Sequence, residues 1–138
     1  MRFQSVISVL VLAAASLVGC GSRYDLGLVS GTVRLDGVPL ADATVVFVPQ
    51  SGRSSIAVTD ADGRYALVYT VKQLGAQPGE HRVSITTGLA ASGAEGDGPA
   101  YKGRPEVLPP RYHENTELTA KVSRGRNTID FELTSAAE

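Results

Sequence analysis

Tryptophan is absent from this 138-residue chain, and cysteine and methionine occur once each. A single cysteine cannot form a disulfide within the chain, so the fold has to rest on an apolar core. Two histidines leave little scope for a histidine cluster of the kind that binds a metal or catalyses a reaction. The charges nearly balance at a net −1, and the one basic cluster is Arg124-Gly125-Arg126. We therefore expect no nucleic-acid partner.

Helical spacing of apolar residues is also missing, and alternation with a period of two dominates instead. Turn formers at Asp36-Gly37, at 60–63 and at 124–127 separate the alternating segments, and the last of these predicts a hairpin. The pattern predicts an all-β antiparallel sandwich of two sheets. Its seven expected strands lie near residues 29–35, 43–48, 55–59, 65–71, 82–86, 117–122 and 129–134.

The inward face of each expected strand predicts the core. In the segment 55–59 we expect Ile56 and Val58 to point inward, and in 65–71 we expect Val71 to share the inward face. The predicted core is Val33, Val45, Phe47, Val58, Tyr65, Leu67, Val83, Ile85, Leu118, Val122, Ile129 and Phe131.

One segment breaks the alternation. Residues 88–112 form a long loop rich in Gly, Ala and Pro, and a loop of this length in a compact domain is usually functional or disordered. Its second half, 105–112, contains three prolines, and we expect it to lie extended along a sheet edge.

The N-terminus carries the most specific motif. A charged start, an apolar run over 6–18 and the sequence Leu17-Val18-Gly19-Cys20 resemble the lipobox of bacterial lipoproteins. The run is shorter than the roughly 20 residues that span a bilayer, so we expect cleavage between Gly19 and Cys20. The resemblance implies fatty acyl chains, such as palmitate, on Cys20, which would hold the protein on a membrane. By resemblance to the lipoprotein sorting rule, Gly21 directly after the lipidated cysteine favours delivery to the outer membrane.

Three motifs in the remainder resemble the carboxypeptidase regulatory-like domain. They are Val29-Ser30-Gly31-Thr32-Val33 with the Asp36-Gly37 turn, then Thr59-Asp60-Ala61-Asp62-Gly63-Arg64-Tyr65, and Pro78-Gly79-Glu80-His81-Arg82-Val83. The resemblance implies a seven-stranded Greek-key sandwich of the transthyretin or prealbumin type. Together, the lipobox and this domain predict three parts: a signal peptide over 1–19, a lipidated cysteine with its tether over 20–27, and the domain over 28–135.

Side chains that could carry chemistry are better explained as structural. The sequence Asp60-Ala61-Asp62-Gly63 places two carboxylates close together, but it lacks the further ligands of a calcium loop and is typical of a turn. Tyr65 and Tyr69 recur on one face with a period of two, which is better explained by packing in the core than by a platform for binding sugars. His81 falls on an inward face, and His113 is expected in a solvated loop. We assign no catalytic, metal-binding or cofactor-binding residue.

The leading functional hypothesis is a non-enzymatic accessory or binding module in a bacterial cell envelope. It would face the periplasm or the outer surface and offer loops or an edge strand to another envelope protein or to a polysaccharide. One alternative is a carbohydrate-binding sandwich, although such proteins typically display tryptophan platforms. A further alternative is a hydrolase similar to the transthyretin-like hydroxyisourate hydrolases. Those enzymes end in Tyr-Arg-Gly-Ser, whereas this chain ends Leu133-Thr134-Ser135-Ala136-Ala137-Glu138.

Overall fold

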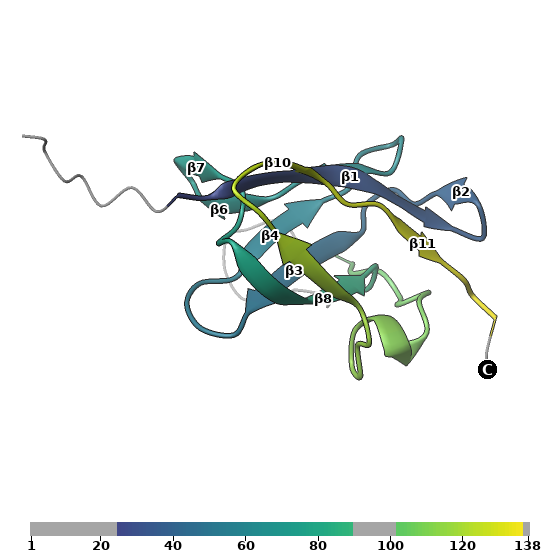
Figure 1. Cartoon of the computed structure of the whole chain (residues 1–138). Helices are drawn as coiled ribbons and strands as arrows, with labels where there is room; N and C mark the ends of the chain where they lie inside the picture. The colour runs from purple at the N-terminus through teal and green to yellow at the C-terminus, as the bar shows by residue number, and fades with distance from the viewer. Residues whose placement is uncertain (1–24, 90–101, 137–138) are drawn as a thin grey trace, which may run out of the picture.

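The computed structural model of the protein describes residues 25–89 and 102–136. Within these ranges the chain is all-β, with strands in two facing sheets and one short 3-10 helix (Figure 1). The predicted signal peptide and Cys20 lie outside the described residues, as does part of the predicted loop 88–112. In the part of the chain that is described, no helix has the length and apolarity needed to cross a membrane.

The first sheet is built around the long strand β1 (Gly27–Leu35). Two strands pair with β1 in parallel, β10 (Gly125–Thr128) and β11 (Phe131–Leu133). Two others pair with it in antiparallel, β2 (Val38–Pro39) and β5 (Arg64–Ala66). The first and last strands of the described chain are therefore neighbours.

The second sheet has six strands, and all its pairings are antiparallel. Their order across the sheet is β7 (Gln73–Leu74), β6 (Val68–Thr70), β4 (Ser55–Val58), β3 (Thr44–Pro49), β8 (Gly79–Thr86) and β9 (Thr119–Val122). The 3-10 helix η1 (Pro110–Tyr112) precedes β9.

The expected sandwich is confirmed, but a wholly antiparallel arrangement is wrong, and so is the hairpin predicted over 124–127. Strand β9 belongs to the second sheet and β10 to the first, so the chain crosses between the sheets at this corner. The Asn127 side chain holds the crossing by accepting from the Ser123 amide at 2.9 Å and donating to the Leu28 carbonyl at 3.1 Å. Turn-forming residues suit a crossing as well as a hairpin, and local sequence does not separate the two.

The other two predicted turns are confirmed. Asp36 and Gly37 have positive φ angles of 52° and 81°, and they join β1 to β2. At the second turn, the Asp60 carboxylate accepts from the backbone amides of Asp62 and Arg64, both at 2.9 Å. Gly31 within β1 lies so close to the segment between β10 and β11 that an added Cβ would be 1.9 Å from the Ile129 carbonyl oxygen.

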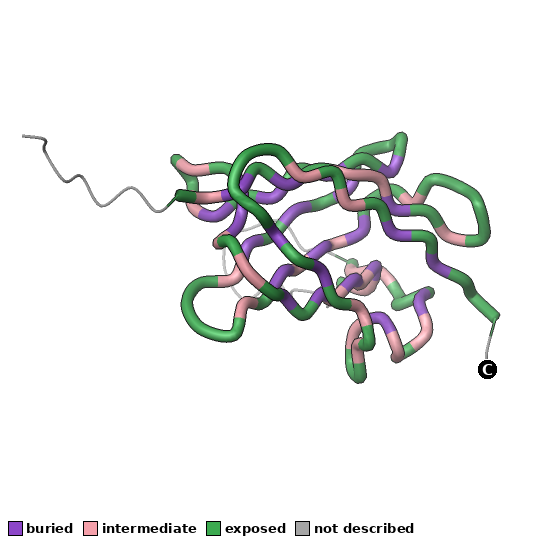
Figure 2. The backbone as a smooth tube through the Cα atoms, in the orientation of Figure 1, coloured by how far each residue is buried: buried purple, intermediate pink, exposed green. Residues whose placement is uncertain are grey.

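Buried and exposed residues alternate along the strands, and most of the predicted core is buried (Figure 2). Leu118 and Ile129 are only half-buried. The phase of β4 is opposite to the prediction, since Ile56 and Val58 are exposed while Ser55 and Ala57 point inward. Further buried residues lie outside the predicted core list: Val29, Ala43, Ala57, Tyr69, Ala76, Leu108, Tyr112, Ala120 and Leu133.

Hydrogen bonds at the end of β4 account for its phase. The buried Thr59 hydroxyl donates to the Leu40 carbonyl at 2.6 Å and accepts from the Ala43 amide at 2.9 Å. Satisfying those two backbone groups turns Thr59 inward, and alternation then places Val58 and Ile56 outside.

The second half of the predicted loop is folded onto the sandwich rather than lying extended. Leu89 and Arg104 exchange two backbone hydrogen bonds, of 3.0 and 2.9 Å. Beyond them, Leu108 and Tyr112 are buried in the core, and η1 begins at Pro110, the second of two consecutive prolines.

Candidate functional surfaces

The predicted lipidation site lies outside the described residues, but the point at which the chain joins the fold is visible. Asp25 is the first described residue, and its carboxylate forms an ion pair of 3.5 Å with Arg124. Arg124 lies in the corner where the chain crosses from β9 to β10. The segment leading from Cys20 therefore reaches the sandwich beside this corner.

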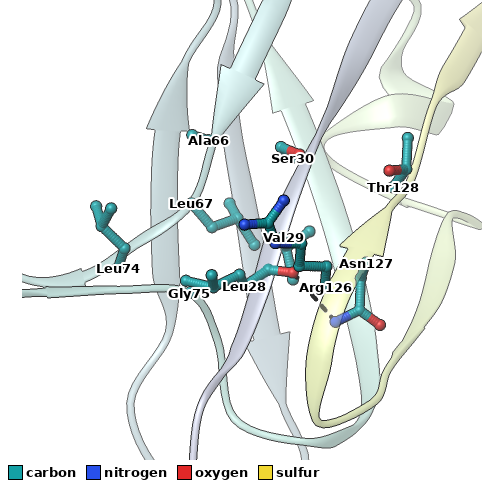
Figure 3. A pocket seen from close by; sticks show the side chains of 10 residues that line it. All are labelled: Leu28, Val29, Ser30, Ala66, Leu67, Leu74, Gly75, Arg126, Asn127 and Thr128. Carbon is teal, nitrogen blue, oxygen red and sulfur yellow. Dashed lines mark hydrogen bonds between the residues drawn. The ribbon is translucent and has the colours of Figure 1, made fainter.

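A groove of about 340 Å³ lies on the first sheet next to the same corner (Figure 3). The outward-facing residues Leu28 and Ser30 of β1 are paired in register with Arg126 and Thr128 of β10. The segment leading out of β7 forms the opposite wall. The lining residues are Leu28, Val29, Ser30, Ala66, Leu67, Leu74, Gly75, Arg126, Asn127 and Thr128.

The groove combines apolar walls with one free cation. Leu28 and Leu74 are exposed, whereas the amide of Asn127 is occupied by the Leu28 carbonyl, as the dashed line in Figure 3 shows. The exposed Arg126 guanidinium has no hydrogen bond or ion pair to any described residue. Such a surface suits a ligand that is both apolar and anionic.

A second surface occupies the outer side of the six-stranded sheet. We call Val48, Ile56, Val58 and Val68 the aliphatic face; each is between 40% and 59% exposed. Ile56 pairs directly with Val68 on one side and with the half-buried Val46 on the other. A hollow of about 390 Å³ lies beside Ile56 and Val68. Single exposed aliphatic residues are normal, but a row aligned across neighbouring strands is a feature of binding surfaces.

Both histidines have a ring nitrogen close to a backbone carbonyl oxygen. The buried His81 ring packs on Phe47, with ring centroids 5.6 Å apart, and its Nε2 lies 2.6 Å from the Gln77 carbonyl oxygen. The His113 Nε2 lies 3.1 Å from the Leu108 carbonyl oxygen. Within residues 25–89 and 102–136, no three His, Cys, Asp or Glu side chains are grouped so that they could hold a metal ion.

The aromatic side chains in the described part of the chain belong to the core. Tyr65 and Tyr69 are buried, as the packing interpretation predicts. Burial, with a smaller contribution from the Asp130 carboxylate, raises the pKa of the Tyr65 hydroxyl, which donates to the Ile129 carbonyl. Phe47, Tyr112 and Phe131 are buried too, so none of these five rings can stack on a sugar from the surface.

Glu106 has a network of hydrogen bonds that sequence reasoning did not predict. Its carboxylate accepts hydrogen bonds from the backbone amides of Thr87, Gly88 and Leu108 and from the Thr87 hydroxyl. No local sequence pattern predicts these hydrogen bonds, because Thr87 and Glu106 lie at opposite ends of the long loop. The groove was missed for a similar reason, since Leu28 and Arg126 meet only through the parallel pairing of β1 with β10.

Comparisons with known proteins place the chain in no family. No protein-family model matches it, and no curated protein matches it. Among solved structures, it is similar to a DUF3823 family protein from Parabacteroides merdae ATCC 43184, with a TM-score of 0.41 and 16% sequence identity. The similarity covers 78% of this chain and 45% of that one, so the chain spans less than half the length of that protein. Membership of the carboxypeptidase regulatory-like family stays a prediction.

Proposed function

We propose that this protein is a non-enzymatic accessory module of the carboxypeptidase regulatory-like type, anchored in a bacterial cell envelope by lipid on Cys20. We further propose that it binds another envelope protein through the aliphatic face. The observation that carries the proposal is the row of Val68, Ile56 and Val46 across three neighbouring strands.

The chemistry of the aliphatic face supports a protein partner. β-Branched side chains have few rotamers, so covering them costs little side-chain entropy, and burial stabilises by about 25 cal/mol per Å² of apolar surface. Toward β8 the face becomes polar, because Val48 is paired with Arg82 and Val46 with Ser84. An apolar centre with a polar margin is the usual anatomy of a protein interface.

The position of the tether is compatible with this use of the sheet. The Asp25–Arg124 ion pair holds the incoming chain beside the corner between β9 and β10. The aliphatic face lies on β3, β4 and β6 of the second sheet, whereas Gly27 and Gly125, beside which the chain enters, pair within the first sheet. An anchor at Cys20 is therefore attached to the other sheet, and the hollow of the face meets the end of the molecule where the chain enters only at Arg53 and Val71.

The anchor is tested by metabolic labelling with an alkyne fatty acid. We expect the wild-type protein to incorporate label and to sediment with membranes, and the Cys20→Ala variant to do neither. The lipid-anchored part of the proposal is wrong if the purified protein keeps an unmodified Met1 or if both proteins behave alike.

The aliphatic face is tested by cross-linking in intact cells followed by purification from detergent extracts. A lysine at Ile56 places a charge in the centre of the face, so we expect Ile56→Lys to lose the cross-linked partner. Thr119→Lys is the matched control, because Thr119 is an exposed residue of β9 in the same sheet. Equal yields of cross-linked species from both variants and the wild type would contradict the proposal.

The non-enzymatic part needs a separate measurement. Purified protein is incubated with hydroxyisourate, the substrate of the hydrolases considered above, and we expect no turnover beyond the uncatalysed rate. It is also applied to affinity gels containing polysaccharides, where we expect unretarded migration. Turnover would show an enzyme, and retardation would show a carbohydrate-binding protein.

A further inference from the structure

Several loops gather where β1 begins, and we call this region the tether end. Gly27 exchanges backbone hydrogen bonds with Ala76 and is paired with Gly125, and Gly79 at the start of β8 is paired with Val122. The β3–β4 loop joins them, because Arg53 Nε donates to the Tyr69 carbonyl at 2.9 Å. Figure 1 shows the start of β1, β6, β7 and the turn into β10 together, with β2 and the C-terminus at the other end.

Charge is unevenly distributed between this region and the rest of the molecule. The tether end carries five basic side chains against two acidic ones, Asp25 and Glu80. Elsewhere the described residues include six basic and nine acidic side chains, so the tether end is the positive end of a nearly neutral chain. The five basic residues are Arg53, Lys72, Lys121, Arg124 and Arg126.

Exposed aliphatic side chains stand among these cations. Val71, at the tip of the turn between β6 and β7, is 100% exposed, and Lys72 follows it directly. Leu74 and Leu28 are exposed at the mouth of the groove, next to the free Arg126. A wholly exposed valine contributes nothing to the core, and a polar residue would serve a turn as well. Apolar tips flanked by Lys and Arg are typical of surfaces that rest on a bilayer.

The length of the tether limits what the tether end can reach. Cys20 and Asp25 are five residue steps apart, so a fully extended tether spans at most about 18 Å. Strand β1, with nine residues, is about 30 Å long, which puts β2 and the Asp36-Gly37 turn much farther away. A linker this short gives an effective concentration in the millimolar range, so even a weak contact with the anchoring membrane is populated.

We propose that the tether end is a lipid-contact surface for an anionic bilayer. Val71, Leu74 and Leu28 lie in the headgroup region, while Lys72, Arg124 and Arg126 face lipid phosphates. The inference rests on the proposed acylation of Cys20 and adds an orientation to it. With the tether end on the lipid, the module stands with β2 and the C-terminus away from the membrane.

The test uses the full lipidated chain, in which an introduced cysteine is the only free thiol because Cys20 is acylated. Val71→Cys is labelled with an environment-sensitive fluorophore. Val38→Cys is the matched control, since Val38 is a 64%-exposed valine beside the Asp36-Gly37 turn at the far end. In vesicles of phosphatidylethanolamine and phosphatidylglycerol, we expect a blue shift and quenching by bilayer-embedded quenchers for the label at 71 only.

A second arm tests the role of charge on the Val71→Cys background. The double variant Lys72→Gln, Arg126→Gln removes two positive charges. We expect it to lower the ratio of membrane-contacting to solvent-exposed label about fivefold per charge. The control pair, Arg34→Gln and Arg64→Gln, changes net charge equally but lies away from the tether end. Phosphatidylcholine vesicles and high salt should reproduce the loss.

The possible results distinguish the orientation, the recognition of anionic lipid and the lipid anchor from one another. Equal solvent exposure of both labels on a protein that carries fatty acid overturns the orientation and leaves the lipid anchor standing. Equal effects of the two charge pairs overturn the recognition of anionic lipid. Protection of the label at 71 that depends on protein concentration and not on lipid shows self-association and overturns the proposal. Absence of fatty acid on Cys20 overturns the proposed anchor, and the orientation with it.

Discussion

At the residue scale, the Glu106 carboxylate connects the end of β8 to the segment before η1. It accepts from the Thr87 hydroxyl at 2.7 Å and from the Leu108 amide at 3.0 Å, and further from the amides of Thr87 and Gly88. Burial alone would raise the pKa of Glu106, but these hydrogen bonds outweigh burial and lower it from 4.5 to about 2. The ionised carboxylate therefore stabilises the fold.

Glu106→Gln is expected to lower the free energy of unfolding at pH 7 by about 1 kcal/mol, since the amide keeps one acceptor and solvent screens part of the charge. The pKa is lower in the folded state, so the stabilisation is present above pH 4.5 and is lost as the pH falls toward 2. Urea unfolding at pH 7 and near pH 2 measures this. A gap between wild type and variant that stays constant with pH would contradict the explanation.

At the scale of the element, two inward hydroxyls lie at the two ends of β4, and they differ in their hydrogen bonding. Thr59, directly after the strand, is fully hydrogen-bonded to Leu40 and Ala43. Ser55, at its start, is buried, and its Oγ has no hydrogen-bond partner among the described residues. A buried polar group costs free energy unless it is paired, so the two hydroxyls should respond in opposite ways to removal.

Thr59→Val keeps the side-chain shape but leaves the Ala43 amide and the Leu40 carbonyl without their partner, so we expect a loss of about 2 kcal/mol in the free energy of unfolding. Ser55→Ala, the matched change in the same strand, is expected to be neutral or stabilising. Chemical denaturation of both variants provides the comparison. Equal losses would contradict the expected difference between the paired and the unpaired hydroxyl.

At the scale of the whole molecule, the chain closes on itself because β1 lies beside both β10 and β11. Phe131 of β11 packs against Phe47, with ring centroids 6.1 Å apart, and against Tyr65 at 6.2 Å. Leu133 is buried as well, and the amide of Thr134 donates to the Tyr112 hydroxyl at 3.0 Å. The last strand therefore completes the core as well as the first sheet.

A chain that ends at Asp130 lacks β11 and should lose about 3–6 kcal/mol, from two large apolar side chains at about 1.5–3 kcal/mol each. That is comparable to the whole stability of many domains, so we expect loss of the near-ultraviolet circular dichroism of the buried tyrosines and of cooperative melting. A chain that ends at Ala136 keeps β11 and serves as the control. Cooperative melting of the shorter chain near the control temperature would contradict this role for β11.

The sequence by itself determined the all-β class, most of the core and the turns at Asp36-Gly37 and Asp60–Gly63, because alternation and turn chemistry are local properties. The lipobox, too, is local, and its meaning stays a prediction. Only the tertiary structure decided the crossing at 124–127 and the parallel pairing of β1, because these depend on which of two sheets receives the chain. It also decided the phase of β4, since hydrogen bonds from Thr59 to a distant turn outweigh the burial of Ile56 and Val58.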